Sequence, residues 1–280
     1  MNKAELFGRA MKTWLVGFCL LLVSGCAKKV DPIATPSYPE SDFLSREINI
    51  SGKTQRYRVF VPKTRTPGER LPIMLYLHGS DERGDNNEGQ LSGPAPLILA
   101  NSNNFRFIIV FPQCPIGRIW DKEMVEIAMA ELAQTVSEFN ADESQTYLAG
   151  FSLGGFGTWM AAATYPDKFA AIMPMSGRVF PRSGERSSVS QEIRSLADAD
   201  QPYNAVAERL SKMPVWIFHG ANDPIVPVEN SRQMAKALKA VGNENARYTE
   251  LENTGHVSLN AAFSDPELLK WLSAQHISAK

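Results

Sequence analysis

One stretch of the chain, TYLAGFSLGGFGTWM at residues 146–160, surrounds a single serine with glycines at the junction of a strand-like run and a helix-like run. Glycine weakens either element, so its presence here needs a reason. The pentapeptide from Gly150 to Gly154 reads G-x-S-x-G, the sequence of a nucleophile elbow. It predicts a strained turn that lifts the hydroxyl of Ser152 above a sheet, with small neighbours that let strand and helix pass closely. The alternative is an ordinary strand-to-helix turn.

A serine hydroxyl needs a histidine base, and the base needs an acid that fixes its tautomer. In the chain order Ser, Asp, His, the segment NTGHVS supplies His256 as the base, and VWIFHGANDPIVP supplies Asp223 just beyond a strand. The alternative roles are a lone loop histidine for His256 and a turn cap for Asp223. We interpret His219 as a structural turn residue and His276 as a surface residue. Ser152, Asp223 and His256 are therefore the predicted catalytic triad.

Acyl transfer also requires backbone N–H groups that bind the developing oxyanion. Leu153 follows the nucleophile at a helix N-terminus and is the first predicted donor. The loop in YLHGSDERGDNN provides the second, the N–H of Ser80, with His78 holding this loop through a side-chain hydrogen bond. For substrate binding the candidates are Phe151 and Trp120, although a position in the core is the commoner role for a tryptophan such as Trp120. The sequence predicts no metal ion and no cofactor.

The elements that must position these residues alternate between strand and helix along the chain. REINISGKTQRYRVFVP predicts a β-hairpin, and helical patterns occupy about residues 121–139, 153–165, 229–241 and 266–276. Short apolar runs lie between them, as in buried parallel strands. The expected fold class is α/β: an N-terminal β-hairpin followed by a mostly parallel central sheet with helices on both faces. The strand-like runs are LPIMLYLHG, FRFIIVFPQ, TYLAGF, FAAIMPMSG, VWIFHG and ARYTEL.

The N-terminus reads as a bacterial lipoprotein signal peptide over residues 1–25. A basic start precedes an apolar run, and VSGC ending at Cys26 resembles the lipobox, whose cysteine becomes lipidated. The alternative is an ordinary signal peptide with an incidental cysteine. Residues 26–42 are expected to form a proline-containing tether, and residues 43–280 the catalytic domain. This arrangement predicts a lipid-anchored protein of the cell envelope, at the outer membrane in a Gram-negative cell.

The formal net charge of the 280-residue chain is −1, without a long basic run, so we expect no nucleic-acid partner. The expected partners are a small-molecule ester substrate and, through the lipid, a membrane. Cys114 would be the cysteine left unmodified in the mature chain, so no disulfide is predicted; a Cys26–Cys114 bridge is the alternative, which lipidation of Cys26 would exclude.

From about Phe43 to its end the chain resembles α/β-hydrolases of the esterase and predicted-peptidase group, related to dienelactone hydrolases and the catalytic domain of prolyl oligopeptidases. The matching stretches are YLHGSDERGDN, GFSLGGFGTWMAAATYPDKFAAIMPMSG, WIFHGANDPIVP and TGH. By this resemblance Ser152, Asp223 and His256 take the triad roles. Asp81 departs from the small residue common after H-G-S in such proteins, and a carboxylate there would oppose an oxyanion.

The resulting functional hypothesis is a serine carboxylesterase that cleaves short or compact acyl esters, carbohydrate-linked esters included, through an acyl-enzyme. A serine peptidase and a non-catalytic surface lipoprotein are the alternatives. Residues 178–206 are either a lid or a surface insertion, and their polar composition argues against a long-chain lipid substrate.

Overall fold

A computed structural model describes residues 38, 42–102 and 105–277. All of them belong to one compact unit, Thr35–Lys280; the other unit, Met1–Ala34, lies outside the described residues. The predicted signal peptide, the lipidation residue Cys26 and most of the tether therefore lie outside them too. Every helix of the described residues is too short or too polar to span a bilayer.

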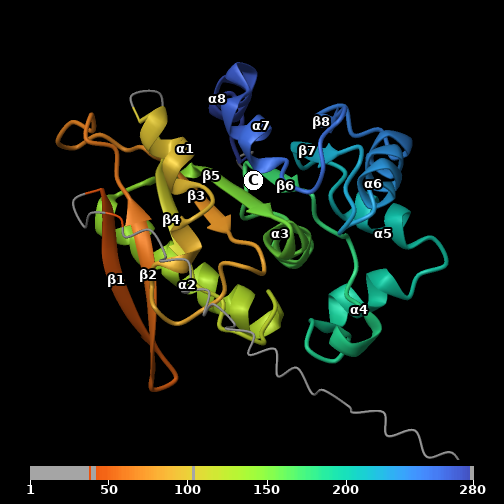
Figure 1. Cartoon of the computed structure of the whole chain (residues 1–280), viewed down its shortest axis with the longest axis horizontal. Coiled ribbons are helices and arrows are strands. Elements are labelled where there is room, and N and C mark those ends of the chain that lie inside the picture. Colours follow the sequence, from red (N-terminus) through yellow and green to blue (C-terminus); the bar gives the residue numbers. More distant parts are fainter. Residues whose placement is uncertain (1–37, 39–41, 103–104, 278–280) are drawn as a thin grey trace, which may run out of the picture. The chain divides into compact units, whose positions relative to one another are not determined.

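The core of the fold is an eight-stranded sheet with the order β1-β2-β4-β3-β5-β6-β7-β8 (Figure 1). The first two strands form an antiparallel hairpin, and β2 is antiparallel to β4, whereas all later pairs are parallel. Ser51 and Gly52 make the hairpin turn with φ angles of 51° and 79°. The predicted hairpin and mostly parallel sheet are confirmed. The strands are β1 (Phe43–Ile50), β2 (Lys53–Phe60), β3 (Pro72–Leu77), β4 (Ile108–Pro112), β5 (Asp142–Phe151), β6 (Ala171–Met175), β7 (Val215–Gly220) and β8 (Ala246–Leu251).

Helices cover both faces of the sheet because buried strands have apolar side chains on both sides. Along β3, Leu75 and Leu77 join the core under α2, α3 and α6, whereas Met74 and Tyr76 join the core under α1, α7 and α8. This alternation confirms the predicted two-sided α/β arrangement. The α-helices are α1 (Ala95–Ala100), α2 (Lys122–Phe139), α3 (Leu153–Thr164), α4 (Gln191–Ala197), α5 (Pro202–Arg209), α6 (Glu229–Ala240), α7 (Leu259–Ser264) and α8 (Pro266–Ser273).

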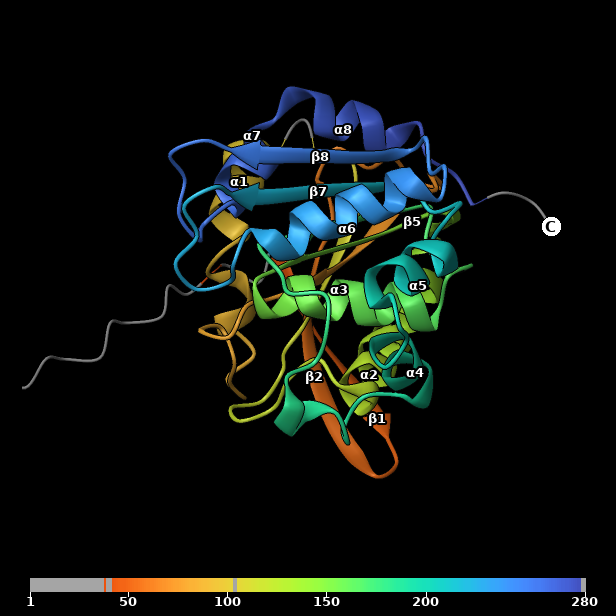
Figure 2. The same ribbon diagram turned by 90° about the vertical axis from the view of Figure 1, so that its right-hand side faces the viewer.

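The parallel strands bring the loops that carry the predicted site to one edge of the sheet. Figure 2 shows β7 and β8 side by side and pointing in the same direction. The loop with Ser80 follows β3, Ser152 follows β5, Asp223 follows β7 and His256 follows β8. Because the carboxyl ends of parallel strands meet at one edge, residues that are far apart in sequence become neighbours.

Candidate active site

Ser152 lies in a strained turn between β5 and α3. Its φ is 56° and its ψ is −112°, a conformation that few residues with a side chain adopt. The chain passes so closely here that a Cβ on Gly154 would lie 1.8 Å from the Leu77 carbonyl oxygen, and one on Gly150 would lie 2.3 Å from the Gly154 carbonyl oxygen. These two positions must be glycine for β3, β5 and α3 to meet. The glycine pattern thus follows from the close packing around the serine.

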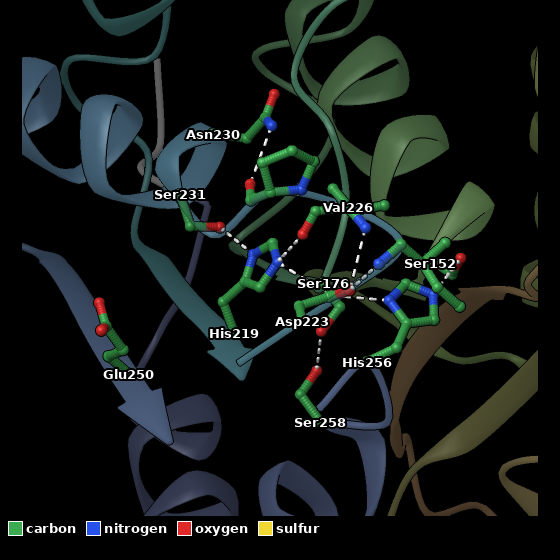
Figure 3. Close-up of polar contacts among 12 residues, drawn as sticks. Ser152, Ser176, His219, Asp223, Val226, Asn230, Ser231, Glu250, His256 and Ser258 are labelled. Atoms are coloured by element: carbon green, nitrogen blue, oxygen red, sulfur yellow. Dashed lines mark hydrogen bonds and ion pairs between the residues drawn. The ribbon is translucent and has the colours of Figure 1, made fainter. Parts of the chain in front are cut away.

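The three predicted triad side chains form one chain of hydrogen bonds (Figure 3). Ser152 Oγ lies 2.7 Å from His256 Nε2, and His256 Nδ1 lies 2.7 Å from Asp223 Oδ2. The Asp223 side chain is fully buried, whereas that of His256 keeps 12% of its surface exposed. A carboxylate at Nδ1 keeps that nitrogen protonated, which leaves Nε2 free to accept the serine proton.

The second oxygen of Asp223 is held by the backbone. Its Oδ1 accepts hydrogen bonds from the N–H groups of Ile225, at 2.8 Å, and Val226, at 2.9 Å. Burial alone would raise the pKa of Asp223, but the hydrogen bonds from His256 and these two amides outweigh it and hold the pKa below its usual value. The carboxylate therefore stays ionised and fixed in place.

His219, interpreted from the sequence as a turn residue, is a buried residue of β7 that contacts Asp223. Its Nε2 lies 3.0 Å from the Val226 carbonyl oxygen and 3.1 Å from Asp223 Oδ2, so Nε2 carries the proton and donates it to both. Its Nδ1 lies 2.6 Å from Ser231 Oγ, which then acts as the donor. Burial lowers the pKa of His219 despite these partners, so the ring remains neutral.

A pair of serines ties the loop that carries His256 to the end of β6. Ser176 Oγ and Ser258 Oγ lie 2.7 Å apart, and both residues are fully buried. Ser258 lies two residues after His256, so this bond restrains the loop that positions His256. Neither serine was a predicted site residue, because the sequence alone does not show that two distant hydroxyl groups become neighbours.

His78 fixes the peptide that would present the second oxyanion donor. The Cys114 N–H donates to His78 Nε2 at 2.9 Å, so the proton lies on Nδ1, which donates to the Gly79 carbonyl oxygen at 2.7 Å. In a trans peptide the N–H points opposite to the carbonyl. The N–H of Ser80 therefore points away from His78, and no described residue accepts a hydrogen bond from it. Burial lowers the pKa of His78 to about 4, although its bond to Gly79 opposes this, so His78 stays neutral near pH 7.

Leu153 supplies the other candidate donor as the first residue of α3, because N–H groups in the first helical turn have no partner within their helix. Asp81 is exposed, and its Oδ1 accepts a hydrogen bond from the Ser80 hydroxyl at 3.3 Å. Arg83 Nε in turn donates to the Ser80 carbonyl oxygen at 2.8 Å. The loop that carries Ser80 is thus held by several contacts.

A pocket of about 720 Å³ opens beside Ser152. Phe151 lines it, and its ring centroid lies 5.1 Å from that of His256. Trp120 does not line it: this side chain is fully buried, and its Nε1 donates to the His78 carbonyl oxygen at 3.0 Å. Of the two roles considered for Trp120, the structure supports the core residue. The lining residues are Gly79, Ser80, Asp81, Glu82, Ser92, Gly93, Pro96, Leu97, Phe151, Ser152, Ile225, His256, Val257, Leu259 and Asn260.

Residues 178–206 contribute no side chain to this pocket. The segment folds back onto the α3 face of the sheet, where the guanidinium carbon of Arg178 lies 3.8 Å from the centroid of the Phe156 ring. Val189 and Ile193 are buried in the core on that face. In this conformation the segment is a packed insertion that leaves the pocket uncovered.

Glu82 is a pocket residue that sequence reasoning missed. Its Oε2 accepts a hydrogen bond from the Gly79 N–H at 2.5 Å. Burial raises the pKa of Glu82 to about 7, although this amide lowers it, and the nearby charge of Asp81 raises it further. The motif HGSDERG contains no signal that its glutamate is half-buried, because burial depends on how the loop packs.

Comparison with known proteins finds similar proteins that are named as esterases. The chain is 28% identical over 193 residues to a bifunctional acetylxylan esterase/xylanase of Neocallimastix patriciarum, covering 67% of this chain and 24% of that protein. It is 26% identical over 297 residues to a probable acetylxylan esterase A of Neosartorya fischeri, covering 93% of this chain and 76% of that protein. A solved thermostable esterase matches with a TM-score of 0.68 and 29% identity over 84% of this chain and 64% of that chain. The chain thus spans about a quarter of the first relative's length.

A family model adds the broader relationship. The model of the prolyl oligopeptidase family matches residues 120–274, which include the serine, the aspartate and the histidine of the hydrogen-bonded chain. This agrees with the resemblance seen in the sequence motifs. Because the match extends over more than half of the chain, the protein belongs to the prolyl oligopeptidase family.

Proposed function

We propose that the protein is a serine carboxylesterase that cleaves esters of short or compact acyl groups, carbohydrate-linked esters included, with Ser152 as nucleophile. The observation that carries this proposal is the continuous chain of hydrogen bonds from Ser152 through His256 to Asp223, placed beside an open pocket. The names of the esterase relatives support the same reaction class.

In the proposed reaction His256 Nε2 takes the proton of Ser152 as its Oγ attacks the ester carbonyl. The carbonyl oxygen becomes an anion, and the N–H groups of Leu153 and Ser80 bind it. His256 then gives the proton to the departing alcohol oxygen, which leaves an acyl group on Ser152. A water molecule attacks this acyl-enzyme by the same steps. Asp223 stabilises the positive charge that forms on His256 in each step.

The proposed restriction to compact, water-soluble esters rests on the surroundings of the pocket. Residues 178–206 do not line the pocket, so this segment offers no continuous apolar surface there to an aggregated lipid. Two of the relatives are named for acetylxylan, an acetylated carbohydrate, which is compatible with a small acyl group on a sugar.

A hydrolysis panel tests the proposal. We would compare kcat/KM for acetyl, butyryl and palmitoyl esters of one alcohol, for acetylated xylosides and for peptide amides, and label the protein with a fluorophosphonate. The expected result is preference for the short esters and labelling at Ser152. Ser152→Ala should lower kcat by about 10⁶. Preference for palmitate, peptide cleavage as fast as ester cleavage, or full activity of the alanine variant would contradict the proposal.

We also propose that the mature protein is anchored to a membrane of the cell envelope by a lipid on Cys26. The support is the lipobox-like VSGC sequence directly after the apolar run. Expression of wild type and Cys26→Ala in a bacterial host, followed by detergent-phase partitioning, tests this. The alanine variant should lose detergent partitioning or accumulate as an uncleaved precursor. Equal partitioning of mature wild type and variant would show that the anchor lies elsewhere.

A further inference from the structure

We propose that Glu82 is a specificity-determining residue that favours esters carrying a free hydroxyl group close to the scissile bond. The proposal rests on the proposed esterase function and adds a recognition group to it. It follows from the position of the Glu82 carboxyl group in the wall of the pocket that also contains Ser152 and His256.

The two oxygens of this carboxyl group are in different situations. Oε2 is occupied by the N–H of Gly79, 2.5 Å away. Oε1 has no hydrogen-bond donor among the described residues. A carboxylate can accept several hydrogen bonds, and a half-buried one that lacks them loses hydration without full compensation. In its ionised form, which predominates above its raised pKa of about 7, Glu82 therefore gives the pocket an acceptor with unused capacity.

Gly93 keeps this oxygen uncovered. Gly93 lines the same pocket, and a Cβ at its position would lie 2.6 Å from Glu82 Oε1 and 3.2 Å from Leu259 Cδ2. Any larger residue would displace the carboxyl group or cover it. Glu82 is thus held between Gly79 on one side and Gly93 on the other.

A substrate hydroxyl is the chemical group that fits this acceptor. A hydroxyl donates a hydrogen bond to a carboxylate, whereas an alkyl group at the same place would leave Oε1 desolvated and a carboxylate there would be repelled. Ile225 and Val257 also line the pocket and are 62% and 55% exposed, so the same pocket offers apolar surface for the C–H groups of the substrate. A pocket with both kinds of surface suits a polyhydroxylated alcohol better than a simple alkyl alcohol.

Matched ester pairs test the assignment. One pair, 2-hydroxyethyl acetate and propyl acetate, places the hydroxyl on the alcohol; the other, the hydroxyacetyl and propionyl esters of p-nitrophenol, places it on the acyl group. The readout is the ratio of kcat/KM within each pair at a pH of about 8 to 9, where Glu82 is ionised. In Glu82→Met, which keeps the chain length but removes the acceptor, this ratio should fall ~10-fold or more in at least one pair. Methionine also removes the acceptor of the Gly79 N–H, which should lower the rates of both members alike, so this loss cancels in the ratio.

Further variants separate recognition from loop structure. Glu82→Gln keeps an acceptor oxygen and should retain part of the ratio, and Gly93→Ala should lower the ratio by displacing the carboxyl group from the other side. This last variant keeps the test possible if Glu82→Met does not fold. Glu88→Gln, a carboxylate removed from the same loop outside the pocket lining, should change neither pair.

Equal losses on both members of each pair, or no change in either ratio, would overturn the role of Glu82. Failure of the proposed esterase function gives a different result from failure of the Glu82 proposal, because the wild type would then hydrolyse none of the four esters.

Discussion

Asp223→Asn should remove most of the activity while the protein remains folded. Every group that contacts this carboxylate is a donor. The N–H groups of Ile225 and Val226 donate to Oδ1, and His256 Nδ1 and His219 Nε2 donate to Oδ2. An asparagine has one oxygen and one NH₂ group, so it cannot accept hydrogen bonds from the backbone amides and from the two histidines at once.

The backbone decides which way the asparagine faces. Turning its NH₂ toward Ile225 and Val226 would leave two amide donors unsatisfied, at about 1 to 3 kcal/mol each. Its oxygen should therefore stay on these amides, and its NH₂ should face His256 Nδ1. His256 would then be protonated on Nε2, the nitrogen that must accept the proton of Ser152. Triads whose histidine is held in the wrong tautomer lose about 10⁴ in kcat. We expect a loss of the same size here, with a small change in KM.

The measurement is steady-state hydrolysis of p-nitrophenyl acetate, together with the rate of fluorophosphonate labelling and urea denaturation. Asp265→Asn is the matched control, because Asp265 caps α8 by accepting from a backbone N–H, and asparagine caps helices equally well. The control should keep wild-type activity. A loss below ten-fold in Asp223→Asn, with the fold intact, would refute the proposed role of Asp223 in holding the tautomer.

Three further predictions follow from the described contacts. His78→Leu frees the peptide that orients the Ser80 N–H, so kcat should fall by about 10² to 10³, and urea denaturation should show a loss of stability from the unsatisfied Cys114 N–H. Gly154→Ala should lower the free energy of unfolding by about 3 kcal/mol or prevent folding, whereas Gly184→Ala, with nothing within 4 Å, should be neutral in the same denaturation assay. Because burial raises the pKa of Glu82 from 4.5 to about 7, folding favours its protonated form, and this part of the stability declines as the pH rises through that window. Glu82→Gln should therefore gain up to about 3 kcal/mol over wild type between pH 4 and pH 8, and parallel stability curves would contradict this.

The main elements of the fold could be predicted because each has a local signal. The turn at Ser51 and Gly52 allows positive φ angles, and the long helix predicted over residues 121–139 is observed as Lys122–Phe139. The short helices α4 and α5 were not predicted within residues 178–206. They have seven and eight residues, and helices this short depend on tertiary packing for their stability. Ile193 of α4 and Val206 of α5 provide that packing, but their burial is not visible in the local sequence.

The candidate site was predictable where its chemistry requires particular residue types in a particular order. Ser152, Asp223 and His256 could be selected because an elbow needs a base and an acid at the same sheet edge. Glu82 and His219 could not be selected from the sequence, since their contacts with the site depend on how the chain packs. A glutamate and a histidine are common in exposed loops, and only the packed structure places them against Gly79 and Asp223.

The close packing at Gly154 also bears on the two proposed oxyanion donors, which lie in different segments of the chain. A Cβ on Gly154 would lie 1.8 Å from the Leu77 carbonyl oxygen and 2.8 Å from that of His78, so the start of α3 rests directly on the end of β3. The Leu153 N–H belongs to the start of α3, and the Ser80 N–H belongs to the loop that follows β3. A side chain at Gly154 would push them apart, and an oxyanion cannot bind two donors held at the wrong separation. In the proposed mechanism, glycine at this position is therefore needed to align the two oxyanion donors as well as to expose the Ser152 hydroxyl.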